Sequence, residues 1–154
     1  MTFGGVVVMV LGCLAVFCLA YWAALGDSHQ NPEAVIQVIA GSGSWKFVYP
    51  GSDGEFGTAD DRVSKGTLLL PRDRSVRLEL STADRLHELS IPGAPARMAA
   101  IPGRPTPLFL LWNTRECEWR CTEPSCPERG TERGPVVVMP EAEFRRQVER
   151  LGPR

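Results

Sequence analysis

Residues 76–92, VRLELSTADRLHELSIP, contain two runs in which apolar and polar side chains alternate, 76–80 and 87–91. Alternation with a period of two places the apolar side chains on one face of a β-strand. Other apolar, β-branched or alternating runs between glycine- and proline-containing turns predict further strands at 34–40, 45–49, 68–70, 98–101, 107–112 and 136–138. Many short strands at close spacing predict a mainly β domain, either an antiparallel sandwich or a barrel.

A helix is expected after the last strand. Pro140 stands where the helix begins, a position that favours proline. Phe144, Val148 and Leu151 recur at helical spacing, and the other faces carry glutamate and arginine. This pattern predicts an amphipathic C-terminal helix that lies on the sheet.

The N-terminal part of the chain has a different composition. The first 26 residues carry no charged side chain, and residues 3–25 form an uncharged, mostly apolar run. A helix of this length, at about 1.5 Å per residue, spans a hydrocarbon core about 30 Å thick. We therefore expect an uncleaved transmembrane anchor at 1–26, a polar linker at 27–33 and one water-side domain at 34–154.

Two alternatives to an uncleaved anchor remain open. A cleaved signal peptide is disfavoured because no basic residues precede the apolar run, which is also long for the core of such a signal. The string VLGC at 10–13 would otherwise make Cys13 a lipidation site. The formal net charge of the whole chain is −1, which gives no reason to expect a nucleic acid as partner.

Four short sequence segments, called strings below, are informative about function. They are WKFVYPG at 45–51, STADRLHELSIP at 81–92, IPGRPT at 101–106 and CEWRC at 117–121. In this order they resemble subunit II of haem–copper cytochrome c oxidases, from about Val35 to Leu151. The resemblance implies a cupredoxin-like Greek-key barrel, which in that family holds a dinuclear copper centre called CuA.

The resemblance assigns metal ligands residue by residue. His87 matches the first histidine ligand, and Cys117 and Cys121 match the two bridging cysteines. Trp119 matches the residue that supplies a backbone carbonyl. Ser125 stands where the family has its second histidine, and Glu128 stands where it has a methionine.

Three interpretations of this incomplete set stay open. Cys126 would supply a replacement sulfur beside Cys117, Cys121 and His87, a set that suits tetrahedral zinc or a single copper. Alternatively, Cys117 and Cys121 lie in a loop and form a disulfide, which requires Cα atoms within about 7 Å. We prefer a degenerate site without CuA, disulfide-bonded or not, then an altered metal site, and place an intact CuA last.

The resemblance also implies a role. The chain would pass electrons from cytochrome c to the catalytic subunit of the oxidase, where oxygen is reduced, and would have no catalytic centre of its own. Its domain would lie on the outer, periplasmic side of the cell membrane, held by one span. The alternatives are a structural or assembly paralogue that conducts no electrons and a pseudopilin-like protein.

The pseudopilin alternative depends on one loop. Residues 50–61, PGSDGEFGTADD, are predicted to be irregular. Pseudopilins have a loop of similar wording and an N-terminal apolar helix. Asp53, Asp60 and Asp61 would supply the carboxylates for a calcium ion, although a solvated loop is the preferred interpretation.

Overall fold

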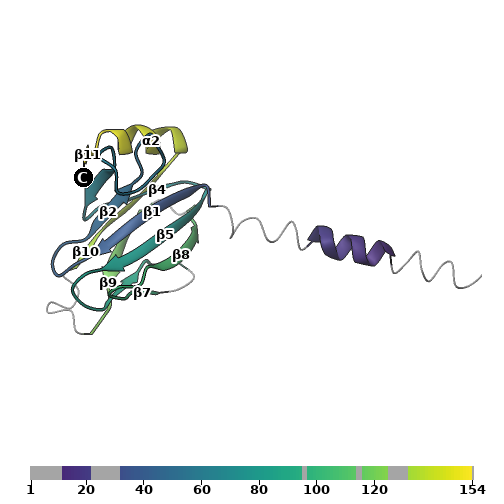
Figure 1. Cartoon of the computed structure of the whole chain (residues 1–154), viewed down its shortest axis with the longest axis horizontal. Coiled ribbons are helices and arrows are strands. Elements are labelled where there is room, and N and C mark those ends of the chain that lie inside the picture. Colours follow the sequence, from purple (N-terminus) through teal and green to yellow (C-terminus); the bar gives the residue numbers. More distant parts are fainter. Residues whose placement is uncertain (1–11, 22–31, 95–96, 114–115, 125–131, 154) are drawn as a thin grey trace, which may run out of the picture. The chain divides into compact units, whose positions relative to one another are not determined.

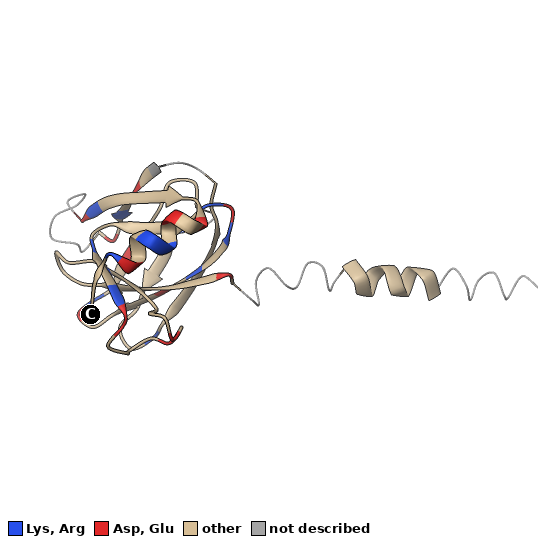
Figure 2. Cartoon of the chain, turned by 90° about the horizontal axis from the view of Figure 1, so that it is seen from above, with Lys and Arg blue, Asp and Glu red and all other residues tan. Residues whose placement is uncertain are grey.

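The structure is a computed structural model that describes residues 12–21, 32–94, 97–113, 116–124 and 132–153. The chain divides into two units, Met1–Asn31 and Pro32–Arg154. In the first unit, residues 12–21 are helical and exposed, and none of them has the colour of a charged residue in Figure 2. Within the described ranges, no helix has both the length and the apolarity that a membrane crossing requires. Most of the expected anchor and linker lie outside the described residues, so the anchor stays a prediction.

The second unit is mainly β, as expected (Figure 1). Its described elements are, in chain order, β1 (Ala34–Ala40), β2 (Lys46–Tyr49), β3 (Arg62–Lys65), β4 (Leu68–Pro71), β5 (Ser75–Thr82), β6 (His87–Ser90), β7 (Met98–Ala100), β8 (Thr106–Leu111), β9 (Glu116–Cys121), β10 (Arg133–Met139), α2 (Glu141–Glu149) and β11 (Gly152–Pro153). Every strand predicted from alternation overlaps one of these. The sequence analysis missed β3, β9 and β11.

The strands form two sheets. One has the order β11-β3-β2-β1-β5-β8, and the other has the order β4-β10-β9-β6-β7. Two pairs are parallel, β1 with β5 and β4 with β10. The other pairs among the described strands are antiparallel, so the antiparallel arrangement expected from the sequence holds only in part. Alternation fixes which face of a strand is buried, but it carries no information about strand direction.

The core lies between the two sheets and follows the alternation. In β5 every second residue is buried, and in β6 His87 and Leu89 are the buried positions. Trp119 of β9 joins the two layers because its ring lies 4.9 Å from that of Trp45 and 5.7 Å from that of Phe47, measured between centroids. Its Nε1 also donates a hydrogen bond of 2.8 Å to the carbonyl of Gly66.

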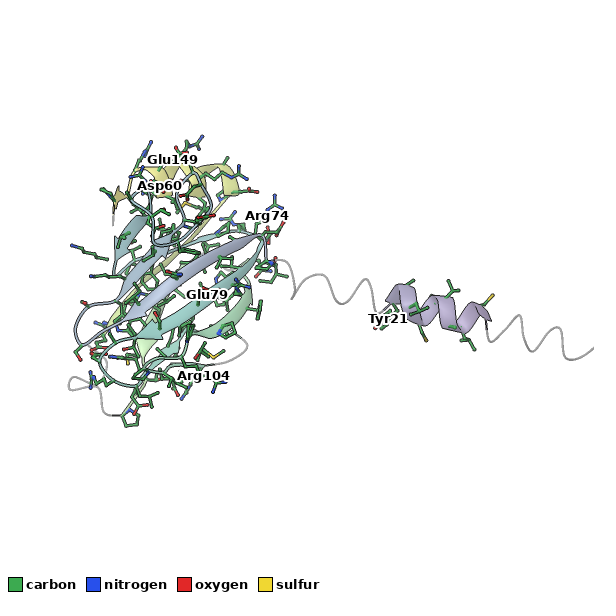
Figure 3. All side chains as sticks on the ribbon, in the orientation of Figure 1. Tyr21, Asp60, Arg74, Glu79, Arg104 and Glu149 are labelled. Carbon is green, nitrogen blue, oxygen red and sulfur yellow. The ribbon has the colours of Figure 1, made fainter. Side chains whose placement is uncertain are left out.

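The two ends of the sandwich differ. Helix α2 packs on β4 and β10, with Phe144 and Val148 against the core, as the helical spacing predicted. Figure 3 shows the labelled Asp60 and Glu149 near this helix and Arg104 at the other end of the domain. That other end gathers the ends of β1, β5 and β9 and the starts of β6 and β10, and it holds the polar cluster described below.

Gly134→Ala is expected to destabilise the domain by about 3 kcal/mol, the upper part of the usual range for overpacking. A Cβ at Gly134 would stand 2.0 Å from the carbonyl oxygen of Gly66 and 2.7 Å from Nε1 of Trp119, in the buried ladder between β9 and β10. The measurement is urea unfolding followed by circular dichroism. Gly152→Ala is the control, since its Cβ would meet nothing within 4 Å, and it should change stability by less than about 0.5 kcal/mol. Equal stabilities of the two variants would contradict the packing argument.

Candidate metal site

Three potential ligands lie at the ends of three neighbouring strands. His87 begins β6, Cys121 ends β9 and Glu132 directly precedes β10. Each stands two residues from an inward-facing position of the same strand or of the strand that it precedes, namely Leu89 on β6, Trp119 on β9 and Gly134 on β10. One imidazole nitrogen, the thiol sulfur and one carboxylate oxygen all lie within 4.8 Å of one another.

The imidazole of His87 is held by an aspartate. His87 is completely buried, and its Nε2 lies 3.0 Å from Oδ1 of Asp84. Hydrogen bonds, chiefly from the Thr82 hydroxyl and also from Ser42, keep the pKa of Asp84 well below its ordinary value. Because an ionised carboxylate only accepts hydrogen bonds, Nε2–H is the donor. In the neutral ring this leaves Nδ1 as the unprotonated nitrogen that faces the cluster.

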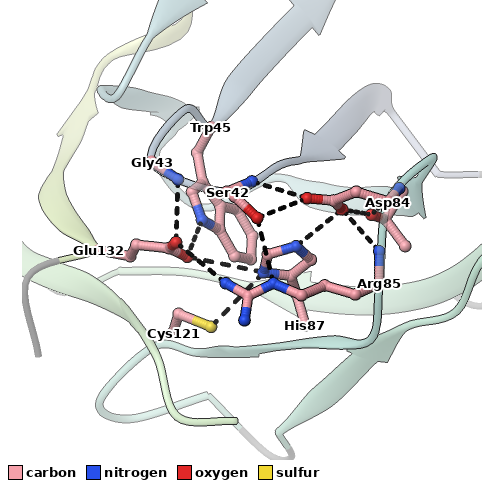
Figure 4. A network of polar contacts seen from close by, with 9 residues as sticks. Ser42, Gly43, Trp45, Asp84, Arg85, His87, Cys121 and Glu132 are labelled. Atoms are coloured by element: carbon pink, nitrogen blue, oxygen red, sulfur yellow. Dashed lines mark hydrogen bonds and ion pairs between the residues drawn. The ribbon is translucent and has the colours of Figure 1, made fainter. Parts of the chain in front are cut away.

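Nδ1 of His87 faces the other two groups (Figure 4). It lies 3.9 Å from Sγ of Cys121 and 3.6 Å from Oε2 of Glu132. The carboxylate of Glu132 accepts hydrogen bonds from the backbone N–H of Gly43, at 3.0 Å, and from Nε1 of Trp45, at 2.9 Å. Both donors belong to the β1–β2 connection, so the sheet that contains β1 and β2 fixes the position of Glu132, which precedes β10 of the other sheet.

Aromatic rings close the inner side of the cluster. The ring of Trp45 stands edge-on to His87 with centroids 5.7 Å apart, and Trp119 lies behind Trp45. Trp119 was expected to supply a backbone carbonyl. The structure places it in the β9–β10 ladder opposite Gly134, with its indole in the core.

Cys117 lies apart from this cluster. It faces the same side of β9 as Cys121, but four residues earlier and opposite Val136. Four steps along an extended strand separate the two Cα atoms by roughly 13 Å. The Cys117 thiol is partly buried, and this burial raises its pKa. Ser125, Cys126 and Glu128 lie outside the described residues.

Comparison with known proteins identifies two proteins of similar sequence. No family model matches it. It is 29% identical over 115 residues to "Cytochrome c oxidase subunit 2" of Thermostichus vulcanus, which covers 75% of this chain and 32% of that protein. It is 24% identical over 137 residues to "Alternative cytochrome c oxidase subunit 2" of Bradyrhizobium diazoefficiens, covering 74% of this chain and 50% of that protein.

The chain is a distant homologue of cytochrome c oxidase subunit II. It spans about a third and a half of the lengths of these two relatives.

Solved structures agree on the fold. The periplasmic domain of subunit II of cytochrome oxidase of Bradyrhizobium japonicum superposes with a TM-score of 0.64 at 20% identity, covering 77% of this chain and 93% of that one. A subunit II of cytochrome c oxidase in a mixed disulfide intermediate with a thioredoxin-like protein gives 0.62 at 22% identity, covering 77% and 91%. The domain is thus a cupredoxin-like two-sheet sandwich, as the four strings predicted.

The described residues do not fit the dinuclear centre that the subunit II resemblance implied. Two thiolates on one ion, each about 2.3 Å from it, lie at most about 4.6 Å apart. Cys117 and Cys121 are far beyond that separation on the extended β9. One imidazole and one thiol come together instead, joined by a carboxylate. We derive no electron-transfer step through a dinuclear copper centre.

A disulfide between Cys117 and Cys121 is also wrong for this conformation. The alternative assumed a loop, whereas both residues belong to β9 and neither forms a disulfide. The alternation in ECEWRC, with charged residues between Cys117, Trp119 and Cys121, was the signal that would have predicted the strand.

Sequence reasoning missed two members of the cluster, Glu132 and Asp84. Neither stands at a ligand position of the resemblance. Glu132 follows a segment without strand signals, so its register with β9 had no sequence signature. Asp84, by contrast, stands three residues before His87 in a predicted turn, where an acid that orients the imidazole is a reasonable expectation.

The loop at residues 50–61 is ordered by hydrogen bonds between its own residues. Asp60 accepts from the N–H and the hydroxyl of Ser52 and from the hydroxyl of Thr58, and buried Asp61 accepts from the N–H of Gly57. These contacts lower the pKa of Asp60 to about 2, with the Thr58 hydroxyl as the largest cause. The carboxylates therefore order the loop, and among the residues that the structure describes they form no cluster suited to a metal ion.

Non-reducing peptide mapping should find no disulfide between Cys117 and Cys121 in the folded chain. The expected result is alkylation of both thiols after unfolding without reductant, because roughly 13 Å between their Cα atoms exceeds the limit of about 7 Å. A Cys117→Ser variant serves as the reference for the alkylated Cys121 peptide. Recovery of the two cysteines in one cross-linked peptide would contradict the placement of both on β9.

Thr58→Val should raise the pKa of Asp60 from about 2 toward its ordinary value. A lowered folded-state pKa stabilises the fold above the unfolded value of about 3.9, and this contribution is lost as the pH falls toward the folded pKa. The variant should therefore show a shallower loss of stability between about pH 4 and pH 2. The measurements are carboxyl NMR titration and unfolding at each pH.

Thr106→Val is the control for this experiment. Its hydroxyl is buried and makes no hydrogen bond among the described residues. An unshifted Asp60 titration in Thr58→Val, or an equal shift in both variants, would disprove the assigned cause.

Proposed function

We propose that the chain is a subunit II-type component of a haem–copper oxidase whose role is structural or in assembly. The observation that carries the proposal is the placement of Cys117 and Cys121 along one extended strand. A dinuclear copper centre needs both thiolates at the same two ions, and this arrangement keeps them apart. Without that centre, the route by which subunit II passes electrons from cytochrome c to the catalytic subunit is absent.

Homology supports the location and the partner. The matched solved domain is described as the periplasmic domain of subunit II, and the sequence has a run of apolar residues long enough for one span before its β domain. We therefore place the domain on the outer side of the cell membrane, against the catalytic subunit of the oxidase. Oxygen reduction belongs to that subunit in this proposal.

Electron transfer from cytochrome c is the second candidate function. It is favoured by the burial of His87 and Cys121 beside Trp45 and Trp119, whose rings are in tilted contact. Such a pair would hold one copper ion, with soft thiolate and imidazole donors. The two candidates differ in copper content and in their effect on cytochrome c oxidation.

Affinity-tagged full chain, isolated from its native membranes, is expected to co-purify with haem–copper oxidase subunits and to lack the near-infrared band of a mixed-valence copper pair. Deleting the chain should reduce the amount of assembled oxidase. The cytochrome c oxidation rate per assembled oxidase should stay unchanged. Elemental analysis and the optical spectrum are the readouts on the purified complex.

Two results would contradict the structural role. A value of about two coppers per chain, with the near-infrared band, would restore the dinuclear centre. A lower oxidation rate per assembled oxidase in a Cys121→Ser strain, with Cys117→Ser as matched control, would favour electron transfer through a single copper. Absence of any oxidase subunit from the purified complex would reject the family role.

A further inference from the structure

The second nitrogen of the buried His87 ring faces a carboxylate oxygen and a sulfur. With Nε2–H directed at Asp84, the lone pair of Nδ1 points toward Oε2 of Glu132 at 3.6 Å and Sγ of Cys121 at 3.9 Å. A nitrogen lone pair and a carboxylate oxygen repel each other when no positive charge lies between them. A second proton on the ring, a hydrogen bond from the Cys121 thiol or a metal ion can each satisfy this lone pair.

The separations suit a metal ion. Tetrahedral bonds of about 2.0 Å to nitrogen or oxygen and about 2.3 Å to sulfur give ligand–ligand edges of about 3.3 Å and 3.5 Å. The observed 3.6 Å and 3.9 Å exceed these edges by a few tenths of an ångström. Small side-chain rotations close such differences without moving the strands.

The surroundings hold the ligands in place and leave one side open. His87 is fully buried, the Cys121 residue is 5% exposed and the Glu132 side chain is 9% exposed. A hollow of about 590 Å³, lined among others by Gly43, Trp45, Trp119 and Glu132, borders the carboxylate. His87 and Cys121 are not among the residues that line this hollow, so a water molecule that completes four-coordination would have to reach the ion past Glu132.

We propose that His87, Cys121 and Glu132 bind a single divalent ion of the zinc class, through Nδ1, Sγ and a carboxylate oxygen. Thiolate with imidazole excludes magnesium and calcium, and the carboxylate suits a divalent ion better than copper(I). Asp84 is a positioning residue that fixes the ring tautomer from behind, as carboxylates behind metal-bound histidines do. Cys117 takes no part. This site goes beyond the proposed structural role and does not depend on it.

The competing arrangement has no metal. His87 would carry a proton on each nitrogen and form ion pairs with Asp84 and Glu132, and Arg85, 3.6 Å from Glu132, would add a further positive charge. This arrangement predicts a neutral thiol at Cys121 and no ion bound. The two arrangements therefore differ in stoichiometry and spectrum.

The experiment uses the purified full chain, stripped with chelator and titrated with zinc or cobalt(II). We expect one ion per chain by elemental analysis. Bound cobalt should give an ultraviolet thiolate-to-cobalt charge-transfer band and the intense visible bands of tetrahedral coordination. Zinc should displace cobalt and abolish both signals.

The variants separate this site from a subunit II-type centre. Cys121→Ser should abolish the charge-transfer band, and Cys117→Ser should leave the band and the affinity unchanged. Glu132→Gln should weaken binding at least tenfold, with the exposed Glu118→Gln on β9 as matched control. Asp84→Asn should weaken binding by about 10- to 100-fold while the charge-transfer band remains at saturating cobalt. Far-ultraviolet circular dichroism checks that each variant is folded.

Three outcomes would overturn the proposal. The first is no retained ion and no charge-transfer band in the folded wild-type chain, which is the result expected for the protonated imidazole. The second is equal loss of binding in Cys117→Ser and Cys121→Ser, which points to a shared two-cysteine centre. The third is unchanged affinity in Glu132→Gln. All three are measured on the isolated chain. Rejection of the metal site can therefore be told apart from a failure of the chain to co-purify with an oxidase.

Discussion

The register between β6 and β9, with Leu89 opposite Cys121, is the constraint on which the site depends. Successive side chains of a strand point to opposite faces, so a shift by one residue would turn Cys121 away from His87 and expose Leu89. Burial of Leu89 and Trp119 on the inner face makes that shift costly. The hydrophobic core therefore sets the geometry of the polar cluster.

A second constraint comes from the opposite sheet. The backbone N–H of Gly43 and the indole of Trp45 both donate to Glu132, and the N–H and hydroxyl of Ser42 donate to Asp84. These residues lie in the β1–β2 connection. The Glu132 side chain is only 9% exposed, and a charge withdrawn from water needs such hydrogen bonds, whereas Asp84 is also partly solvated. The connection thus stabilises the negative charge that the imidazole faces from both sides.

More of the fold than of the candidate site could be predicted from the sequence. Alternation located the strands of the core, because every second residue of a half-buried strand must be apolar, and the order of four strings indicated a subunit II-like sandwich. Resemblance also pointed to His87 and Cys121, which the structure brings into one cluster. It assigned Cys117 to the same site, because matched spacing says nothing about whether the intervening CEWRC is extended or looped. Glu132 could not be found, since its role depends on a long-range register with β9 and on donors from another sheet.

Replacement of the missing ligands alone would not rebuild a dinuclear centre in this chain. Bringing Cys117 to Cys121 requires β9 to leave its ladder with β10, in which Cys117 lies opposite Val136 and Trp119 opposite Gly134. Each ladder hydrogen bond lost costs about 1 kcal/mol, and removing the Trp119 side chain from the core costs about 3 kcal/mol or more. That sum is comparable to the total stability of many domains, about 5–15 kcal/mol. The extended β9 is therefore part of what holds the two sheets together, and the pairing that stabilises the fold also keeps the two cysteines apart.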